Sequence, residues 1–163
     1  MRPIPGGGFF RGIAGPLKPN DNYGQMIMRA FEHAKQLRNR ALPNGRFWIL
    51  FQFYGGVTAK DPKDAEAGLA VAFLAALDGR RIEPVMILGG LDSEGRLTAV
   101  DDFNTHVTKT LNLGFRKVII PLGQGSEISD TLQQRIEKNQ LTVIEAATLK
   151  DLVALVAAGS PPN

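Results

Sequence analysis

Apolar side chains recur at intervals of three and four residues through residues 22–40, the pattern of a helix with one buried face. The apolar positions of this segment are Tyr23, Met26, Ile27, Ala30, Phe31, Ala34 and Leu37. Between them lie basic residues that we expect to face outward: Arg29, Lys35, Arg38 and Arg40. Residues 46–54 are rich in aromatic and β-branched side chains and follow a Pro-Asn-Gly turn, so they predict an interior strand.

Residues 58–77 read TAKDPKDAEAGLAVAFLAAL, a charged loop that leads directly into a helix apolar on every side. Small residues alternate with large ones, so this helix can approach a sheet closely and fill a core on more than one face. We therefore expect it to be the central buried helix, with any chemistry at its start. Its first turn carries Asp64 and Glu66, where unpaired backbone N–H groups favour a carboxylate or a bound anion. In the simpler interpretation, Asp61 or Asp64 only caps the helix.

The second half of the chain alternates between strand and helix patterns. We expect a strand at 85–91, a turn at 92–95, a strand at 96–100, a helix from Asp101 or Asp102 to Leu113, a strand at 117–122, a helix at 127–138 and a strand at 141–145. Thr148 and Asp151 have the spacing of a capping box, which predicts a last helix. This alternation indicates an α/β domain with parallel strand pairing.

The length of 163 residues fits one domain with a real core. We expect an irregular arm at 1–20, the domain at 21–158 and a frayed tail at 159–163. The charge of +3 is uneven, because residues 1–50 hold eight basic and two acidic residues. The chain has no cysteine, which excludes disulfides, a thiolate nucleophile and a cysteine zinc cluster. No apolar run is long enough to cross a bilayer, so we expect a cytoplasmic protein without a membrane partner.

Motifs for common cofactors are absent from the sequence. There is no GxxxxGK[ST] loop, so nothing here binds ATP by that device. The histidines, His33 and His106, lie far apart and lack a zinc-binding frame, so we expect neither a metal nor another cofactor. Five arginines form a candidate set of nucleic-acid contacts: Arg38, Arg40, Arg46, Arg80 and Arg81. An ordinary solvated surface is the simpler interpretation of these arginines.

Two segments give the chain a resemblance to the proteolytic domain of the Lon protease family, and the resemblance covers residues 15–157. Residues 58–66 read TAKDPKDAE where that family has TPKDGPSAG, and residues 95–121 match the length of its second motif. The end of that second segment, GFRKVIIP, is similar to the family's GIKTVIIP. The resemblance implies an α/β (α+β) domain with the Lon proteolytic fold, which is ribosomal protein S5 domain 2-like.

The same resemblance predicts that the protease chemistry has been lost. Lon-type proteases use a serine of the first motif as nucleophile and a lysine of the second as its base, and these positions fall on Asp64 and Asn104. If Glu66-Ala67-Gly68 is matched to the family's Ser-Ala-Gly instead, the serine position falls on Glu66. A carboxylate is a poor nucleophile toward an amide, and Asn104 has no group that can take a proton near neutrality. Asp101 and Asp102 replace the paired glycines before the lysine. We therefore expect no catalytic residue of the Ser-Lys type.

A narrower resemblance is to the Lon-related ATPases of BREX phage-resistance systems, through MIMRAFEHAK, VMILGG and FRKVIIPL. It implies a non-proteolytic domain that assembles or regulates a larger ATP-dependent machine in phage defence. The partner would be an ATPase domain of a longer chain or other copies of the chain itself. Nucleic acid would be bound through that larger assembly.

Two alternatives stay open at this stage. The first is a carboxylate-based or metal-dependent hydrolase in the former protease cleft. Its candidate residues are Lys60, Asp61, Asp64, Glu66, Asp101, Asp102, Asn104 and His106. The second is a nucleic-acid-binding module that uses the arginines named above.

Overall fold

A computed structural model of the chain describes residues 21–39 and 62–157. The predicted arm at 1–20, the predicted strand at 46–54 and the predicted tail lie outside the described residues. The elements in chain order are α1 (Asp21–Arg38), the 3₁₀ helix η1 (Pro62–Ala65), α2 (Glu66–Asp78), β1 (Met86–Ile87), β2 (Gly90–Leu91), β3 (Leu97–Thr98), α3 (Phe103–Asn112), β4 (Lys117–Pro121), the 3₁₀ helix η2 (Gln124–Glu127), α4 (Asp130–Lys138), β5 (Thr142–Ala146) and α5 (Leu149–Ala157).

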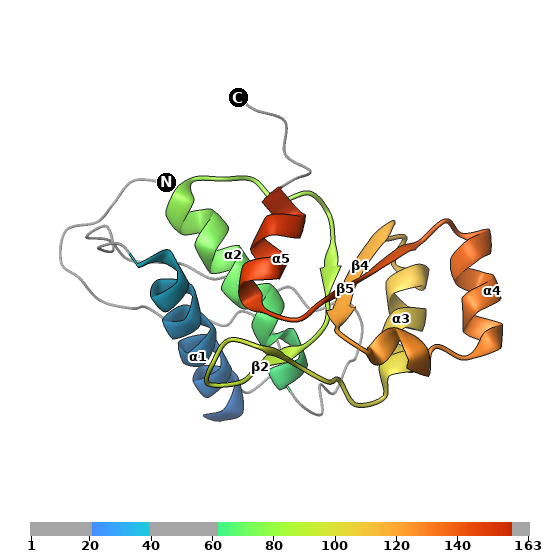
Figure 1. Ribbon diagram of the computed structural model, residues 1–163, viewed down its shortest axis with the longest axis horizontal. Coiled ribbons are helices and arrows are strands. Elements are labelled where there is room, and N and C mark those ends of the chain that lie inside the picture. Colours follow the sequence, from blue (N-terminus) through green and yellow to red (C-terminus); the bar gives the residue numbers. More distant parts are fainter. Residues whose placement is uncertain (1–20, 40–61, 158–163) are drawn as a thin grey trace.

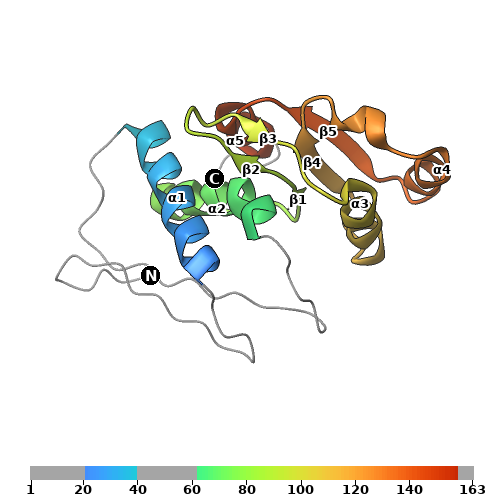
Figure 2. The same cartoon turned by 90° about the horizontal axis from the view of Figure 1, so that it is seen from below.

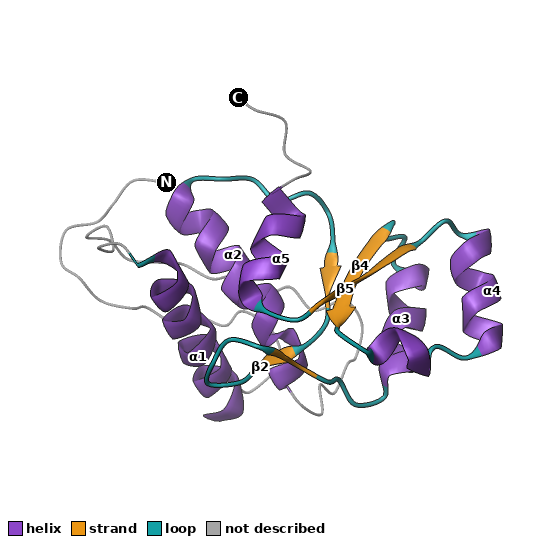
Figure 3. Ribbon diagram, in the orientation of Figure 1, coloured by secondary structure: helices purple, strands orange, loops and turns teal. Residues whose placement is uncertain are grey.

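Within residues 62–157, three strands form a parallel sheet in the order β1-β4-β5 (Figure 3). Met86 of β1 lies opposite Val118 of β4, and Lys117 of β4 lies opposite Thr142 of β5. The strands β2 and β3 form a separate antiparallel ribbon, in which Gly90 lies opposite Thr98. The predicted α/β class with parallel pairing is confirmed.

The sheet lies between two layers of helices. Successive residues of β4 point to opposite faces of the sheet, so each face packs against its own layer. Ile119 packs with buried side chains of α1, α2 and α5. Val118 and Ile120 pack with those of α3 and α4 on the other face. The two groups of helices lie on opposite sides of the sheet (Figures 1 and 2). Among the described residues, two hydrophobic cores therefore share one sheet.

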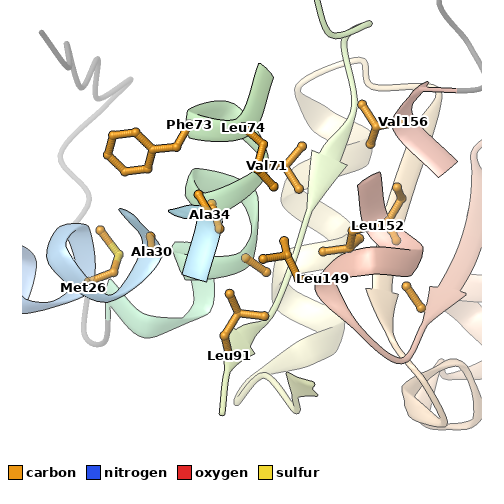
Figure 4. Close-up of a cluster of buried hydrophobic side chains, with 14 of the residues drawn as sticks. Met26, Ala30, Ala34, Val71, Phe73, Leu74, Leu91, Leu149, Leu152 and Val156 are labelled. Atoms are coloured by element: carbon orange, nitrogen blue, oxygen red, sulfur yellow. The ribbon is translucent and has the colours of Figure 1, made fainter. Parts of the chain in front are cut away.

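The helix α2 is central, as the sequence predicts. Its buried Phe73 meets Phe31 of α1 edge to face, with ring centroids 5.2 Å apart, and other side chains of α2 pack among those of α1 and α5 (Figure 4). Gly68 lies against β1, because a Cβ built there would come within 3.4 Å of the Ile87 Cβ. Gly79 ends the helix in the left-handed conformation that glycine adopts without strain.

The single strand predicted at 85–91 is wrong, because the structure divides it into β1 and β2. Gly89 separates the two pieces with a φ of +135°, a conformation that strongly favours glycine. The chain therefore leaves the parallel sheet after β1 and enters the ribbon with β2. The hairpin itself is confirmed, with shorter strands than predicted.

Two predicted helix starts also need correction. Asp102 precedes α3 with a φ of +51°, and its side chain makes no capping hydrogen bond; instead, its carbonyl accepts the N–H of Thr105 at 2.8 Å. The helix expected from residue 127 begins at Asp130, after η2. The capping box of α5 is confirmed, since the Asp151 N–H donates to the Thr148 Oγ1 at 3.2 Å and the Thr148 N–H donates to the Asp151 Oδ2 at 2.9 Å. Within the described ranges, every helix is too short or too polar to cross a membrane.

Candidate functional site

The start of α2 is held against the turn between β1 and β2 by two backbone hydrogen bonds. The Gly89 N–H donates to the Asp64 carbonyl at 2.8 Å, and the Ala67 N–H donates to the Gly89 carbonyl at 3.1 Å. Ala65 occupies the N-cap position and has no side-chain cap. Asp64 lies one residue earlier, within η1, so the prediction that Asp64 caps the helix is wrong.

The Asp64 side chain points to α3. Its Oδ2 lies 3.9 Å from the Nε2 of His106, and the two side chains are 13% and 31% exposed. His106 stands two residues after Asn104, so the structure brings the first and second sequence motifs together at the η1–α3 contact. At 3.9 Å the two groups are beyond hydrogen-bond distance, so the carboxylate acts on the imidazole as a nearby negative charge.

Asn104 is used structurally. Its Nδ2 donates to the Glu127 carbonyl at 2.9 Å, and its Oδ1 accepts the Ser129 N–H at 3.2 Å. Both ends of the amide therefore connect the start of α3 to the segment that leads into α4. Ser129 is the N-cap of α4 and makes no side-chain cap of its own.

Glu66 is only 1% exposed, although it stands in the first turn of α2. Arg29 of α1 donates hydrogen bonds to both oxygens of the Glu66 carboxylate. The Nε lies 3.0 Å from Oε1 and 3.2 Å from Oε2, and the Nη2 lies 3.0 Å from Oε2. A bidentate arginine satisfies a buried carboxylate in the geometry that both groups prefer. The arginine side chain itself is 48% exposed.

A hollow of about 320 Å³ lies beside this ion pair. Its lining comes from α1, η1, α2 and both strands of the ribbon: Arg29, Lys63, Glu66, Gly90, Leu91, Thr98 and Ala99. Gly90 is necessary there, because a Cβ at this position would lie 2.6 Å from the Thr98 Oγ1. We call this feature the Arg29 hollow.

The remaining cleft candidates are not gathered into one cluster. Asp101 and Asp102 are exposed before α3, and Lys60 and Asp61 lie outside the described residues. In the described part of the chain, no three His, Cys, Asp or Glu residues are grouped closely enough to hold a metal ion.

The candidate nucleic-acid arginines differ in their surroundings. The Arg38 Nε pairs with the Asp78 Oδ1 at 3.0 Å and its Nη2 donates to the Leu77 carbonyl at 3.2 Å, so this residue ties the end of α1 to the end of α2. Arg80 and Arg81 are exposed after α2. Arg40 and Arg46 lie outside the described residues.

Sequence reasoning missed Arg29, Gly90 and Thr98 as site residues. Arg29 flanks the buried Met26 and Ala30 on α1, so its position at the edge of the apolar face was a usable sign that it could reach a neighbouring helix. Nothing local marked Thr98, because its role depends on the ribbon pairing.

Comparison with known proteins gives limited information. No protein-family model matches the chain. The chain is similar to the DNA repair protein RadA of Synechocystis sp., with 31% identity over 71 residues. The matched segment is 43% of this chain and 14% of RadA, so the chain spans a small part of that relative.

Proposed function

We propose that the chain is a non-proteolytic domain with the Lon proteolytic fold, which assembles or regulates a larger ATP-dependent machine. The observation that carries the proposal is the state of the two positions where the Lon resemblance expects a serine and a lysine. Asp64 lies in η1 beside His106, and Asn104 has both ends of its amide bound to backbone groups of another segment. Neither residue can act as a Ser-Lys dyad.

The surroundings of these positions support the same proposal. The two motifs approach each other at the η1–α3 contact, as two halves of one former cleft would. Glu66 stands where the family motif has its glycine, two residues after the serine position, and it forms a buried ion pair with Arg29. The polar groups at these positions therefore make contacts within the domain, which supports a non-proteolytic role.

The experiment that tests the proposal is hydrolysis of casein and of a fluorogenic peptide by the purified chain. We expect no cleavage by the natural chain. A double variant, Asp64→Ser with Asn104→Lys, is compared with Asp64→Ser alone, and circular dichroism checks both because Asn104→Lys removes the acceptor of the Ser129 N–H. Steady cleavage by the natural chain that disappears in Asp64→Ala would overturn the proposal.

The kind of machine in which the domain would act is inferred from similarity alone. The similarity to a DNA repair protein favours a machine that acts on DNA. The BREX resemblance favours one in phage defence, with an ATPase domain or further copies of the chain as partners. A measurement of the mass of the purified chain in solution tests self-association. A mass larger than that of one chain supports contacts between copies, whereas a monomer means that assembly would depend on another domain.

A second candidate function is hydrolysis by an acid–base pair, and the Asp64–His106 approach of 3.9 Å favours it. A panel of ester and phosphoester substrates tests this function. Removal of a general base costs about 10²- to 10⁴-fold, so His106→Gln should lower turnover by this factor, and Asp64→Asn should lower it as well. Silence of the natural chain on the whole panel, with and without Mg²⁺ or Mn²⁺, would remove this candidate. An unchanged melting temperature in the presence of those ions would remove its metal-dependent form.

A further inference from the structure

Two side-chain amides join residues 100–104 to residues 124–129, and they do so in opposite directions. Gln124 of η2 bonds to the backbone of Val100, and Asn104 of α3 bonds to the backbone of the segment that carries Gln124. We call this pair of side chains the amide clasp. We propose that the clasp makes the two segments one cooperative unit, which opens and closes as a whole. Such a unit is a property of the fold and does not depend on the proposed loss of proteolysis.

The Gln124 half of the clasp is buried. The Val100 N–H donates to the Gln124 Oε1 at 2.9 Å, and the Gln124 Nε2 donates to the Val100 carbonyl at 3.1 Å. Gln124 is 4% exposed and Val100 is 3% exposed, so water cannot replace these bonds while the segments stay closed. Loss of the Gln124 amide would leave two buried backbone groups without this partner.

The Asn104 half meets the Gln124 half at Glu127. The Asn104 Nδ2 donates to the Glu127 carbonyl, and the Gln124 Nε2 lies 3.3 Å from the Glu127 Oε2. The two amides therefore contact the backbone and the side chain of one residue. Hydrogen bonds that are connected in this way support one another, so their contributions to stability are not independent.

The segment that carries Gln124 is weakly held by its own backbone. The Ser126 N–H donates to the Gly123 carbonyl at 3.4 Å, and the Ile128 N–H donates to the Gly125 carbonyl at 3.3 Å. Both distances exceed the usual length of about 2.9–3.0 Å, as is common in short 3₁₀ helices. We therefore expect the shorter bonds of the clasp to decide whether the segment stays closed.

The unit also includes one side of the η1–α3 contact. His106 lies on the same turn of α3 that follows Asn104, and its N–H donates to the Asp102 carbonyl at 3.3 Å. When the unit opens, the start of α3 is released together with His106. The clasp therefore holds the imidazole at its distance from Asp64.

Native-state hydrogen exchange of the isotopically labelled full chain tests the unit, with the amides of Val100 and Ser129 as its two reporters. The Leu88 amide, which donates to the Ile119 carbonyl at 3.0 Å, reports unfolding of the sheet. Gln124→Met fills the same space without a polar amide and removes the acceptor of the Val100 N–H alone. We expect exchange to accelerate about tenfold or more at both reporters and by less at Leu88.

Asn104→Ala gives the reciprocal measurement and does not alter the buried Gln124. It removes the acceptor of the Ser129 N–H, and it should accelerate exchange at Val100 as well. Gln133→Ala on α4 is the matched control, because the Gln133 amide donates to Glu137 of its own helix at 3.0 Å. This control should leave both reporters unchanged.

The reporter that has kept its own acceptor decides the outcome. If each variant accelerates only the amide whose acceptor it removes, the two halves of the clasp are independent and the proposal is wrong. Equal acceleration at Leu88 would also overturn it, because the whole domain would then be opening. Acceleration of both reporters beyond Leu88, in both variants, supports a single unit.

Discussion

The Arg29–Glu66 pair differs from the other ion pairs of the described residues in how deeply one partner is buried. Glu66 is 1% exposed, whereas Lys35 and Glu32 on α1 are each close to half exposed. A buried carboxylate that loses its counterion keeps the full cost of its desolvation, but an exposed carboxylate regains water. Removal of the cation should therefore have very different effects at the two places.

Arg29→Ala should lower the free energy of unfolding by about 2–4 kcal/mol, because it leaves Glu66 buried without a partner. Urea denaturation measures the change. Lys35→Ala is the matched control and should change stability by less than about 0.5 kcal/mol. Arg29→Met combined with Glu66→Met should recover at least half of the loss, since both charges then leave the interior. Equal effects of Arg29→Ala and Lys35→Ala would contradict this account of the pair.

Asn104 gives a second prediction at the residue scale. Asn104→Ala removes one hydrogen bond to the Glu127 carbonyl and one from the Ser129 N–H, and it should cost about 1–2 kcal/mol of unfolding free energy. Hydrogen exchange at the Ser129 amide should accelerate, because that N–H loses its acceptor. Gln133, which lies one turn into α4, provides the reference amide. Unchanged protection at Ser129 would mean that the bond is not maintained in solution.

At the scale of elements, predictions from the sequence were most accurate where a residue pattern was compatible with a single type of element. The α1 face, the central α2 helix, β4, β5 and the capping box of α5 all follow from local periodicity and from side chains close in sequence. The strand predicted at 85–91 failed because apolar content cannot tell a continuous strand from two strands in different sheets. The Gly89-Gly90 pair lies at the point where the predicted strand is divided. The positive φ of Gly89 could not be predicted from the local sequence, because it depends on β1 pairing with β4 while β2 pairs with β3.

The same limit applies to the helix starts. An aspartate before a helix predicts a side-chain cap, yet Asp102 turns the chain through a left-handed backbone conformation and uses its carbonyl. Asp64 likewise provides a carbonyl to Gly89 and turns its side chain toward His106. A local motif cannot predict whether the carbonyl or the side chain of such an aspartate is used, because the group that it contacts comes from another element.

The β2–β3 turn provides a prediction at this scale. The Asp92 Oδ1 accepts the N–H groups of Glu94 and Arg96, each at 2.9 Å, and its Oδ2 accepts a bond from the Arg96 Nε at 2.9 Å. The side-chain bond from Arg96, together with the backbone bonds, holds the pKa of Asp92 below its ordinary value of 3.8. Because the folded pKa is depressed, the stabilising effect is present above pH 3.8 and is lost as the pH falls through the folded value.

A carbon-detected NMR titration of Asp92 should therefore have its midpoint below 3.8. In Arg96→Gln the midpoint should move closer to 3.8, but the two backbone bonds should keep it from passing that value. A midpoint of Asp92 at or above 3.8 in the natural chain would mean that the turn does not hold these bonds in solution.

At the scale of the whole molecule, the shared sheet explains how the candidate site is assembled. Elements of the first core place Arg29, Asp64 and Glu66, and α3 of the second core places Asn104 and His106. Sequence motifs identified Asp64, Glu66, Asn104 and His106, since these lie in phrases with a family resemblance. The Arg29 hollow could not be predicted in this way, because its lining comes from segments far apart in the chain, and their approach depends on the packing of α1 on α2.

The nucleic-acid-binding alternative that the arginines raise in the sequence is the last property to test. Arg80 and Arg81 are exposed after α2, and Arg116 and Arg135 lie in the region around α3 and α4. If the first pair contacts phosphates, affinity should fall steeply with salt, because each duplex contact adds about 0.9 to the slope of log affinity against log salt concentration.

Fluorescence anisotropy with a labelled duplex, repeated over a series of salt concentrations, measures that slope. Arg80→Gln with Arg81→Gln should weaken binding at low salt and reduce the slope by about 2, one unit for each lost phosphate contact. Arg116→Gln with Arg135→Gln removes the same charge from the other helical layer and should leave the slope unchanged. Equal losses in both double variants would mean that net charge alone drives association, because a specific surface requires the position of the arginines to matter. Absence of binding by the natural chain at low salt would contradict the nucleic-acid-binding alternative.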